Sequence, residues 1–176
     1  MAITKATGPV LGNYPVGTEN VALGDTALDS VASDGNYNTA IGAKAGTAIT
    51  TGDLNVAVGA QSLDATSTGS SNTAIGTSAL GANTTASSNT AVGESALGSN
   101  TTGDRNVAVG ATALDALTAA NYNVAVGWTS LGATTTGANN TALGSFAMQS
   151  NTTANNNVAV GYASLQANTT GHSNVA

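Results

Sequence analysis

The segment Asn72-Thr73-Ala74-Ile75-Gly76 decides the fold, because the pattern Asn-(Val/Thr)-Ala-(Val/Ile/Leu)-Gly recurs along nearly the whole chain. Copies of this pentad begin at Asn20, Asn38, Asn55, Asn72, Asn89, Asn106, Asn123, Asn140 and Asn157, and a shortened copy begins at Asn174. The first spacing is 18 residues and every later spacing is 17. A fixed period of this kind indicates a protein that stacks one small structural unit along an axis.

Other columns of the repeat keep the same register. A large aliphatic residue stands eight positions after the asparagine in most units: Leu28, Leu63, Leu80, Leu97, Leu114, Leu131, Met148 and Leu165. The second unit has Gly46 at this position, and we expect Ile49 to fill the gap. A glycine or alanine follows fourteen positions after the asparagine, directly after a threonine-rich turn. These columns predict a core built around the leucines.

The pentad alternates with period two, which is typical of a β-strand. A second short strand is expected around the Ala/Ser-Leu pair, so that two strands and two turns form one coil of 17 residues. Two helices of ordinary length do not fit into such a unit. The sequence therefore predicts an all-β fold, a parallel β-solenoid (β-roll) whose coils stack about 4.8 Å apart.

Stacking in register places identical side chains above one another. The asparagines can then form an amide ladder, in which each side chain bonds to the next. The ladder is expected to include Asn55, Asn72, Asn89, Asn106, Asn123, Asn140 and Asn157. An alternative is that asparagine is present only because it tolerates a left-handed turn conformation.

The two faces of the pentad leave the orientation of the strand open. If the aliphatic residues at positions two and four point inward, a bare Ala/Gly face remains outside. If alanine and glycine point inward, the coil is thin and a stripe of valine and isoleucine faces outward. Either arrangement leaves a flat, uncharged strip larger than a soluble monomer normally exposes. We therefore expect a homo-oligomer about the long axis, most simply a trimer.

Composition excludes several other classes of protein. The chain of 176 residues is 41% hydrophobic, 3% aromatic and 7% charged, and it contains no cysteine. With a net charge of −6 and only Lys5, Lys44 and Arg105 as cations, it is not expected to bind nucleic acid. No apolar run approaches the roughly 20 residues needed to cross a bilayer, so membrane insertion is not expected. The first nine residues contain no apolar segment of a secretory signal.

The segment Asn72-Thr73-Ala74-Ile75-Gly76-Thr77-Ser78-Ala79 resembles the head repeats of YadA-like trimeric autotransporter adhesins. It also resembles the Asn-Thr-Ala-Val-Gly repeats of bacteriophage tail fibres and related virion appendages. The resemblance covers about residues 20–176 and implies a left-handed, homotrimeric β-roll that serves as an adhesive or spacer module. Because the coil is longer than in the autotransporters and no signal or anchor is visible, location in a virion is favoured over the alternative, a bacterial surface adhesin head.

Residues 1–19 are expected to form a degenerate N-terminal capping coil or attachment segment, with Pro9 and Pro15 blocking edge pairing. Residues 20–176 are expected to form the solenoid of nine repeats and a shortened tenth. Its last coil leaves an open edge strand, which would dock onto virion or fibre proteins at the chain end.

No arrangement of residues typical of an enzyme is present, and no cofactor or metal is expected. His172 lacks a nucleophile elbow or a cysteine partner, and we expect it to be solvated in a turn. Asp29, Asp64 and Asp115 share one column but lie two or three coils apart, which does not suit paired-carboxylate catalysis.

The aromatic residues suggest a binding site. Trp128 and Tyr162 occupy one column, and Phe146 lies one position away in the intervening coil. Such a cluster could stack on the sugar rings of a host glycan, although packing between chains, or isolated aromatic residues on the surface, is the favoured explanation.

The threonine pairs Thr84/Thr85, Thr101/Thr102, Thr135/Thr136, Thr152/Thr153 and Thr169/Thr170 suggest a different function. Their regular ranks would suit an ice-binding solenoid. Neighbouring strand residues point to opposite faces, however, and the ranks break at Ala119.

Overall fold

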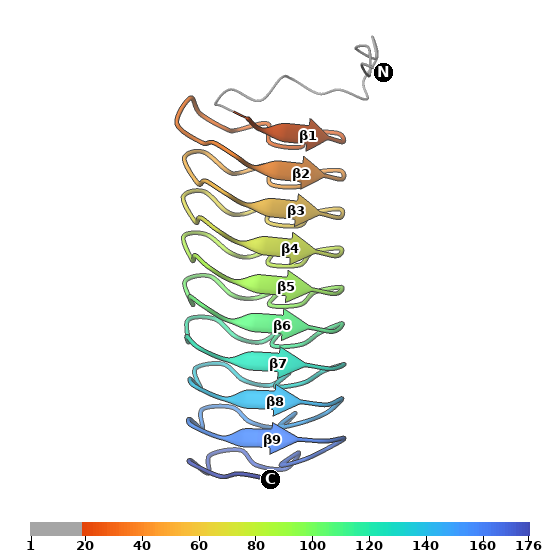
Figure 1. Ribbon diagram of the computed structural model, residues 1–176, viewed down its shortest axis with the longest axis vertical. Coiled ribbons are helices and arrows are strands. Elements are labelled where there is room, and N and C mark those ends of the chain that lie inside the picture. The colour runs from red at the N-terminus through yellow and green to blue at the C-terminus, as the bar shows by residue number, and fades with distance from the viewer. Residues whose placement is uncertain (1–18) are drawn as a thin grey trace.

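The computed structural model describes residues 19–176, which form an all-β solenoid with one three-residue strand in each coil (Figure 1). The strands are β1 Val21–Leu23, β2 Thr39–Ile41, β3 Val56–Val58, β4 Thr73–Ile75, β5 Thr90–Val92, β6 Val107–Val109, β7 Val124–Val126, β8 Thr141–Leu143 and β9 Val158–Val160. The expected capping coil over residues 1–19 lies almost entirely outside the described residues.

All nine strands of the described part form one parallel sheet in the order β1 to β9. Equivalent residues pair directly, as Ala57 pairs with Ala74 and Ala74 pairs with Ala91. The strands therefore stack one below another along the long axis, and the C-terminus lies at the opposite end of the described stack from β1 (Figure 1). The predicted parallel solenoid of 17-residue coils is confirmed.

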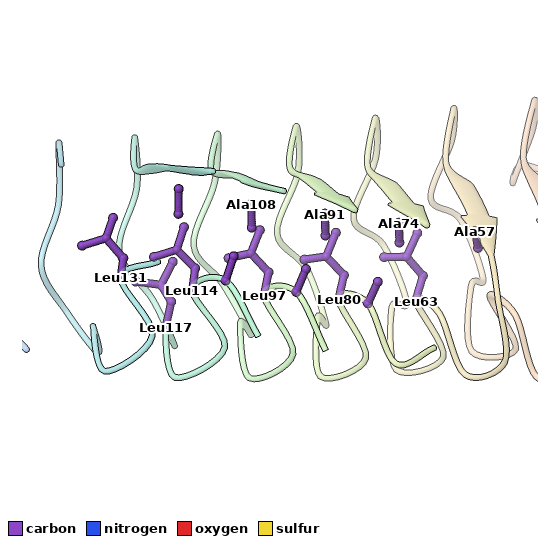
Figure 2. Close-up of a cluster of buried hydrophobic side chains, with 14 of the residues drawn as sticks. Ala57, Leu63, Ala74, Leu80, Ala91, Leu97, Ala108, Leu114, Leu117 and Leu131 are labelled. Carbon is purple, nitrogen blue, oxygen red and sulfur yellow. The ribbon is translucent and has the colours of Figure 1, made fainter. Parts of the chain in front are cut away.

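The middle alanine of each strand points inward, and its two neighbours point outward. In β4, Ala74 is fully buried whereas Ile75 is 41% exposed. Figure 2 shows these alanines facing the leucine column across a thin core. Of the two possible orientations, the protein adopts the one that leaves a stripe of valine, isoleucine and threonine outside.

The leucine column forms the centre of the core over most of the described stack, whereas Leu165, in the last full coil, is only partly buried. Leu63, Leu80, Leu97 and Leu114 are all fully buried (Figure 2). At Gly46, a side chain would meet the Cδ1 atom of Ile49 at 3.0 Å, and Ile49 itself is buried. Ile49 thus fills the space that a leucine occupies in the other coils.

The expected second strand is wrong for the described residues, where turns occupy this side of the coil. Two residues of each turn adopt left-handed backbone angles, as shown by φ of 56° at Ser78 and 50° at Leu80. An extended strand needs negative φ at both positions, so none forms. The turns still bond between coils, since the Leu80 N–H donates to the Ala96 carbonyl at 3.0 Å.

The glycine that ends the pentad is required for two reasons. Gly93 has φ of +135°, which side-chain-bearing residues rarely adopt, and a Cβ atom there would lie 2.6 Å from the carbonyl of Gly110 in the next coil. The chain therefore turns sharply after each strand and allows neighbouring coils to approach closely.

Candidate functional site

The outer side of the sheet presents a uniform surface, which we call the strand face. It consists of the first and third residues of every strand: Val21, Leu23, Thr39, Ile41, Val56, Val58, Thr73, Ile75, Thr90, Val92, Val107, Val109, Val124, Val126, Thr141, Leu143, Val158 and Val160. None of these residues is charged, and none is buried. Several are more than a third exposed, including Val21 at 53% and Val160 at 59%. The strand face is thus a continuous uncharged strip along the described rod, mostly apolar and interrupted only by threonines.

The asparagine column lies inside the solenoid and stabilises the turn before each strand. Asn55 donates from its backbone N and from Nδ2 to Oδ1 of Asn38, at 3.0 and 3.1 Å. Its Nδ2 also donates to the Gly69 carbonyl at 2.9 Å. The pentad asparagines of the described coils do not have positive φ, so the alternative explanation from left-handed turns is wrong for them. The column is a buried ladder with a structural role.

A second ladder, two residues before most pentads and interrupted at Ala138, was not foreseen as such. The Ser70 N–H donates to Oγ of Ser87 at 3.1 Å, and the Ser87 N–H donates to a carboxylate oxygen of Asp104 at 2.7 Å. His172 belongs to this column, because its Nδ1 accepts the Asn155 N–H at 2.8 Å. Its ring is exposed, as expected. The signal in the sequence was the recurrence of short acceptor side chains in this one position.

The threonine ranks are unequal in the structure. The hydroxyl groups of Thr84, Thr101 and Thr135 each donate to a backbone carbonyl of the next coil, at 3.1, 2.9 and 3.2 Å. The second threonine of each pair is exposed, and Ala119 interrupts that rank. Because the first rank already uses its donors within the stack, the paired hydroxyl array of an ice-binding surface has little support.

Three aromatic residues on consecutive coils form a contact series, which we call the aromatic ladder. The rings of Trp128 and Phe146 are 4.8 Å apart between centroids, with an interplanar angle of 63°. The rings of Phe146 and Tyr162 are 5.7 Å apart at 87°. Trp128 is 56% exposed and Tyr162 is 77% exposed, while Phe146 is partly buried between them. The structure therefore brings together the three residues singled out from the sequence.

Two glutamines follow the aromatic residues in the last two of these coils: Gln149 comes three residues after Phe146, and Gln166 comes four residues after Tyr162. Gln166 donates from Nε2 to Oε1 of Gln149 at 2.9 Å, and both residues retain solvent access. The Gln149 N–H bonds to the Phe146 carbonyl at 3.2 Å, so one tight turn links this amide to the aromatic ladder. Residues 116–176 contain no Asp, Glu, Lys or Arg. Asp115 lies in the coil before that of Trp128, in the column that continues through Gly132 to the two glutamines.

The aspartate column contributes to a shallow hollow rather than to a carboxylate pair. The hollow has a volume of about 430 Å³, and the residues that line it include Asp64, Gly81, Gly98 and Asp115. The two glycines separate the carboxylates by three coils, or about 14 Å at the spacing of a β-sheet. Burial raises the pKa of Asp64 and of Asp115 above the usual value of 3.8. Asp29, the third member of the column, is exposed and lies in the coil of β1, outside the hollow.

Within residues 19–176, no three or more His, Cys, Asp or Glu side chains gather closely enough to hold a metal ion. The same residues contain no helix long and apolar enough to cross a membrane. Comparison with known proteins gives no relative: no family model, curated protein or solved structure matches this chain. The resemblance to YadA-like and phage-fibre repeats consequently rests on the repeat motif alone.

Proposed function

We propose that this protein is a non-enzymatic structural rod whose strand face packs against identical chains to form a homotrimer. The observation that carries the proposal is the strand face itself, an uncharged strip that runs along all nine described strands. Burial of apolar surface contributes about 25 cal/mol per Å², so each coil would add to the stability of the assembly. Soluble proteins rarely leave a strip of this extent in contact with water.

A second copy of the chain is the best partner for this surface. The outer residues of successive strands repeat once per coil. A second copy of the chain has the same distance between its coils, so its outer residues match this repeat. Valine, isoleucine and threonine of parallel copies can then interdigitate coil by coil along the rod. Three narrow strips meeting about one axis bury one another symmetrically, which is also the arrangement that the family resemblance implies.

A rod of this kind suits a virion appendage such as a tail fibre, where it would act as a spacer that carries an adhesive surface. The repeat motif, similar to those of phage fibres, supports this location. Fibre or virion proteins bound at the chain ends would then set the position of the rod in the particle.

Charge substitutions on the strand face test the proposal. Sedimentation equilibrium of the unmodified protein should give three times the chain mass of 16.8 kDa. The double variant Ile75→Lys/Val109→Lys should sediment as a monomer, because lysines directed at the trimer axis repel one another and lose hydration. The matched variant Thr85→Lys/Thr102→Lys places the same charges on the exposed threonine rank and should stay trimeric.

Far-ultraviolet circular dichroism confirms that each variant retains its β-structure. A monomeric unmodified protein would overturn the proposal. So would a strand-face variant that remains trimeric under the same conditions.

A further inference from the structure

We infer that the aromatic ladder, together with Gln149 and Gln166, is a binding site for a neutral glycan. The inference goes beyond the structural role proposed above and does not depend on the oligomeric state. It rests on three features: the geometry of the rings, the amide pair beside them and the absence of charge from this part of the rod.

The rings form a stepped platform whose outer members are open to solvent. Edge-to-face contacts with Phe146 support Trp128 from one side and Tyr162 from the other. These contacts hold the two exposed rings in place before any ligand binds, which reduces the entropy lost on binding. Trp128 and Tyr162 are two coils apart, about 9.6 Å at the spacing of a β-sheet, so they can contact separate sugar units of one chain.

Aromatic faces carry a partial negative charge and attract C–H groups that are slightly positive. The C–H faces of pyranose rings have this character, while the hydroxyl groups at the ring edges need hydrogen-bond partners. Gln149 and Gln166 supply such partners beside the platform. Their mutual bond of 2.9 Å uses one Nε2 hydrogen of Gln166 and one lone pair of Gln149, which leaves the remaining amide donors and acceptors for a ligand.

The electrostatics favour a ligand without charge. Every Asp, Glu, Lys and Arg of the chain lies within residues 1–115, and the aromatic ladder spans residues 128–162. A sulfated or sialylated glycan would find no lysine or arginine on residues 116–176. A basic peptide would find no carboxylate side chain on residues 116–176, and Asp115 in the preceding coil is partly buried. A neutral hexose polymer requires neither a cation nor a carboxylate from the protein.

The ladder is distinct from the strand face. Trp128 follows Gly127, the glycine that turns the chain away from strand β7, so its column begins the next side of the coil. Other coils carry Ala60, Thr77, Glu94 or Ala111 in this column. Packing along the full length of a trimer would call for a repeated residue, whereas the aromatic residues occupy three coils near one end of the described stack.

The single tryptophan of the chain provides a direct reporter, because Trp128 lies in the site. The emission maximum of Trp128 should shift on titration with at least one of maltoheptaose, cellopentaose, chitopentaose and mannan, and the shift should saturate. Heparin serves as the charged control and should cause no saturable change. Isothermal titration calorimetry then measures the affinity of the variants, including those that lack the reporter.

Trp128→Ala and Tyr162→Ala should each weaken binding of that oligosaccharide about tenfold or more. Tyr37→Ala is the matched control, since Tyr37 is 52% exposed and lies far along the stack from the ladder. Its affinity should equal that of the unmodified protein. Gln149→Ala/Gln166→Ala should weaken binding while leaving the aromatic platform in place.

Failure of all four neutral glycans to bind would overturn the inference, as would binding of heparin alone. Sedimentation of the same variants separates the inference from the proposed function. If Trp128→Ala dissociates the oligomer and leaves glycan affinity unchanged, the ladder packs between chains and the glycan site is wrong. If the protein is monomeric but still binds glycan through Trp128, only the proposed trimer fails.

Discussion

Asn72 donates two hydrogen bonds to a single atom of Asn55, the side-chain oxygen Oδ1: one from its backbone N at 3.0 Å and one from its own Nδ2 at 3.2 Å. The same Nδ2 also donates to the Ala86 carbonyl at 2.8 Å. One side chain therefore links its own coil to the preceding coil and holds the turn at the end of its own coil, which leads into β5. Repetition of this arrangement makes the asparagine ladder the main polar connection inside the rod.

Removing one member of the ladder should destabilise the protein strongly. In Asn89→Ala, the Gly103 carbonyl loses the donor Nδ2 and the Asn106 N–H loses the acceptor Oδ1. Because these groups are buried, the free energy of unfolding should fall by about 3 kcal/mol. Urea unfolding followed by circular dichroism measures the change. Thr85→Ala changes an exposed residue and should alter the free energy of unfolding by less than about 0.5 kcal/mol. Equal losses in both variants would contradict the role of the ladder.

Two glycines separated by five positions should respond very differently to alanine. Gly93→Ala places a side chain on a backbone with φ of +135° and 2.6 Å from the Gly110 carbonyl, so the coils must move apart. We expect a loss of more than about 3 kcal/mol, or failure to fold. In Gly98→Ala the new Cβ atom has its closest contact with the Ser95 carbonyl oxygen, at 3.1 Å, and the substitution should cost less than about 1 kcal/mol. Soluble expression and urea unfolding compare the two. A tolerated Gly93→Ala would show that the coils do not approach as described.

The repeat predicts most of this fold, and the reasons are physical. The Asn pentad and the Leu80 column recur at a constant spacing, and only stacked coils place such residues above one another. The orientation of the strand was not predictable, because burying either face of the pentad gives a closed coil. The structure resolves it by packing Ala74 against the leucine column, and the threonine or valine before it then faces outward.

The incorrect second strand has a different cause. The alternation of small and large side chains near Leu80 is compatible with a strand, but the backbone there adopts positive φ at Ser78 and Leu80. Serine and leucine do not favour positive φ in the way that glycine or asparagine does, so nothing at Ser78 or Leu80 indicates it. The hollow at Gly81 and Gly98 depends on the path of this turn, so the sequence could not reveal it either.

The buried leucines should contribute more to stability than exposed leucines do. Leu97→Ala removes a fully buried side chain that faces Ala108 across the core (Figure 2), so a cavity is left in a thin interior. The free energy of unfolding should fall by about 2–5 kcal/mol. Leu54→Ala changes a leucine that is 57% exposed and should cost less than about 1 kcal/mol. Denaturant midpoints compare the variants. Similar midpoints would argue against a leucine-centred core.

The carboxylates at the two ends of the hollow predict an unusual dependence of stability on pH. Burial raises the pKa of Asp64, although a bond to its own backbone N–H and the charge of Lys44 partly offset the effect. Burial likewise raises the pKa of Asp115 against two backbone hydrogen bonds. Each carboxyl group therefore holds its proton to a higher pH when folded than when unfolded. In that window the folded state binds more protons, so the stability contributed by these groups falls as the pH rises through it.

It follows that Asp64→Asn/Asp115→Asn should be more stable than the unmodified protein at pH 7, because the cost of burying two charges is removed. The difference should shrink as the pH falls toward and below the usual carboxyl pKa, where both groups are protonated in either state. Thermal unfolding at pH 3, 5 and 7 measures the effect. Asp34→Asn is the control for charge alone, since Asp34 is exposed. A double variant that is less stable at pH 7 would mean that the hydrogen bonds to these carboxylates outweigh their burial, and the assigned direction of both pKa shifts would be wrong.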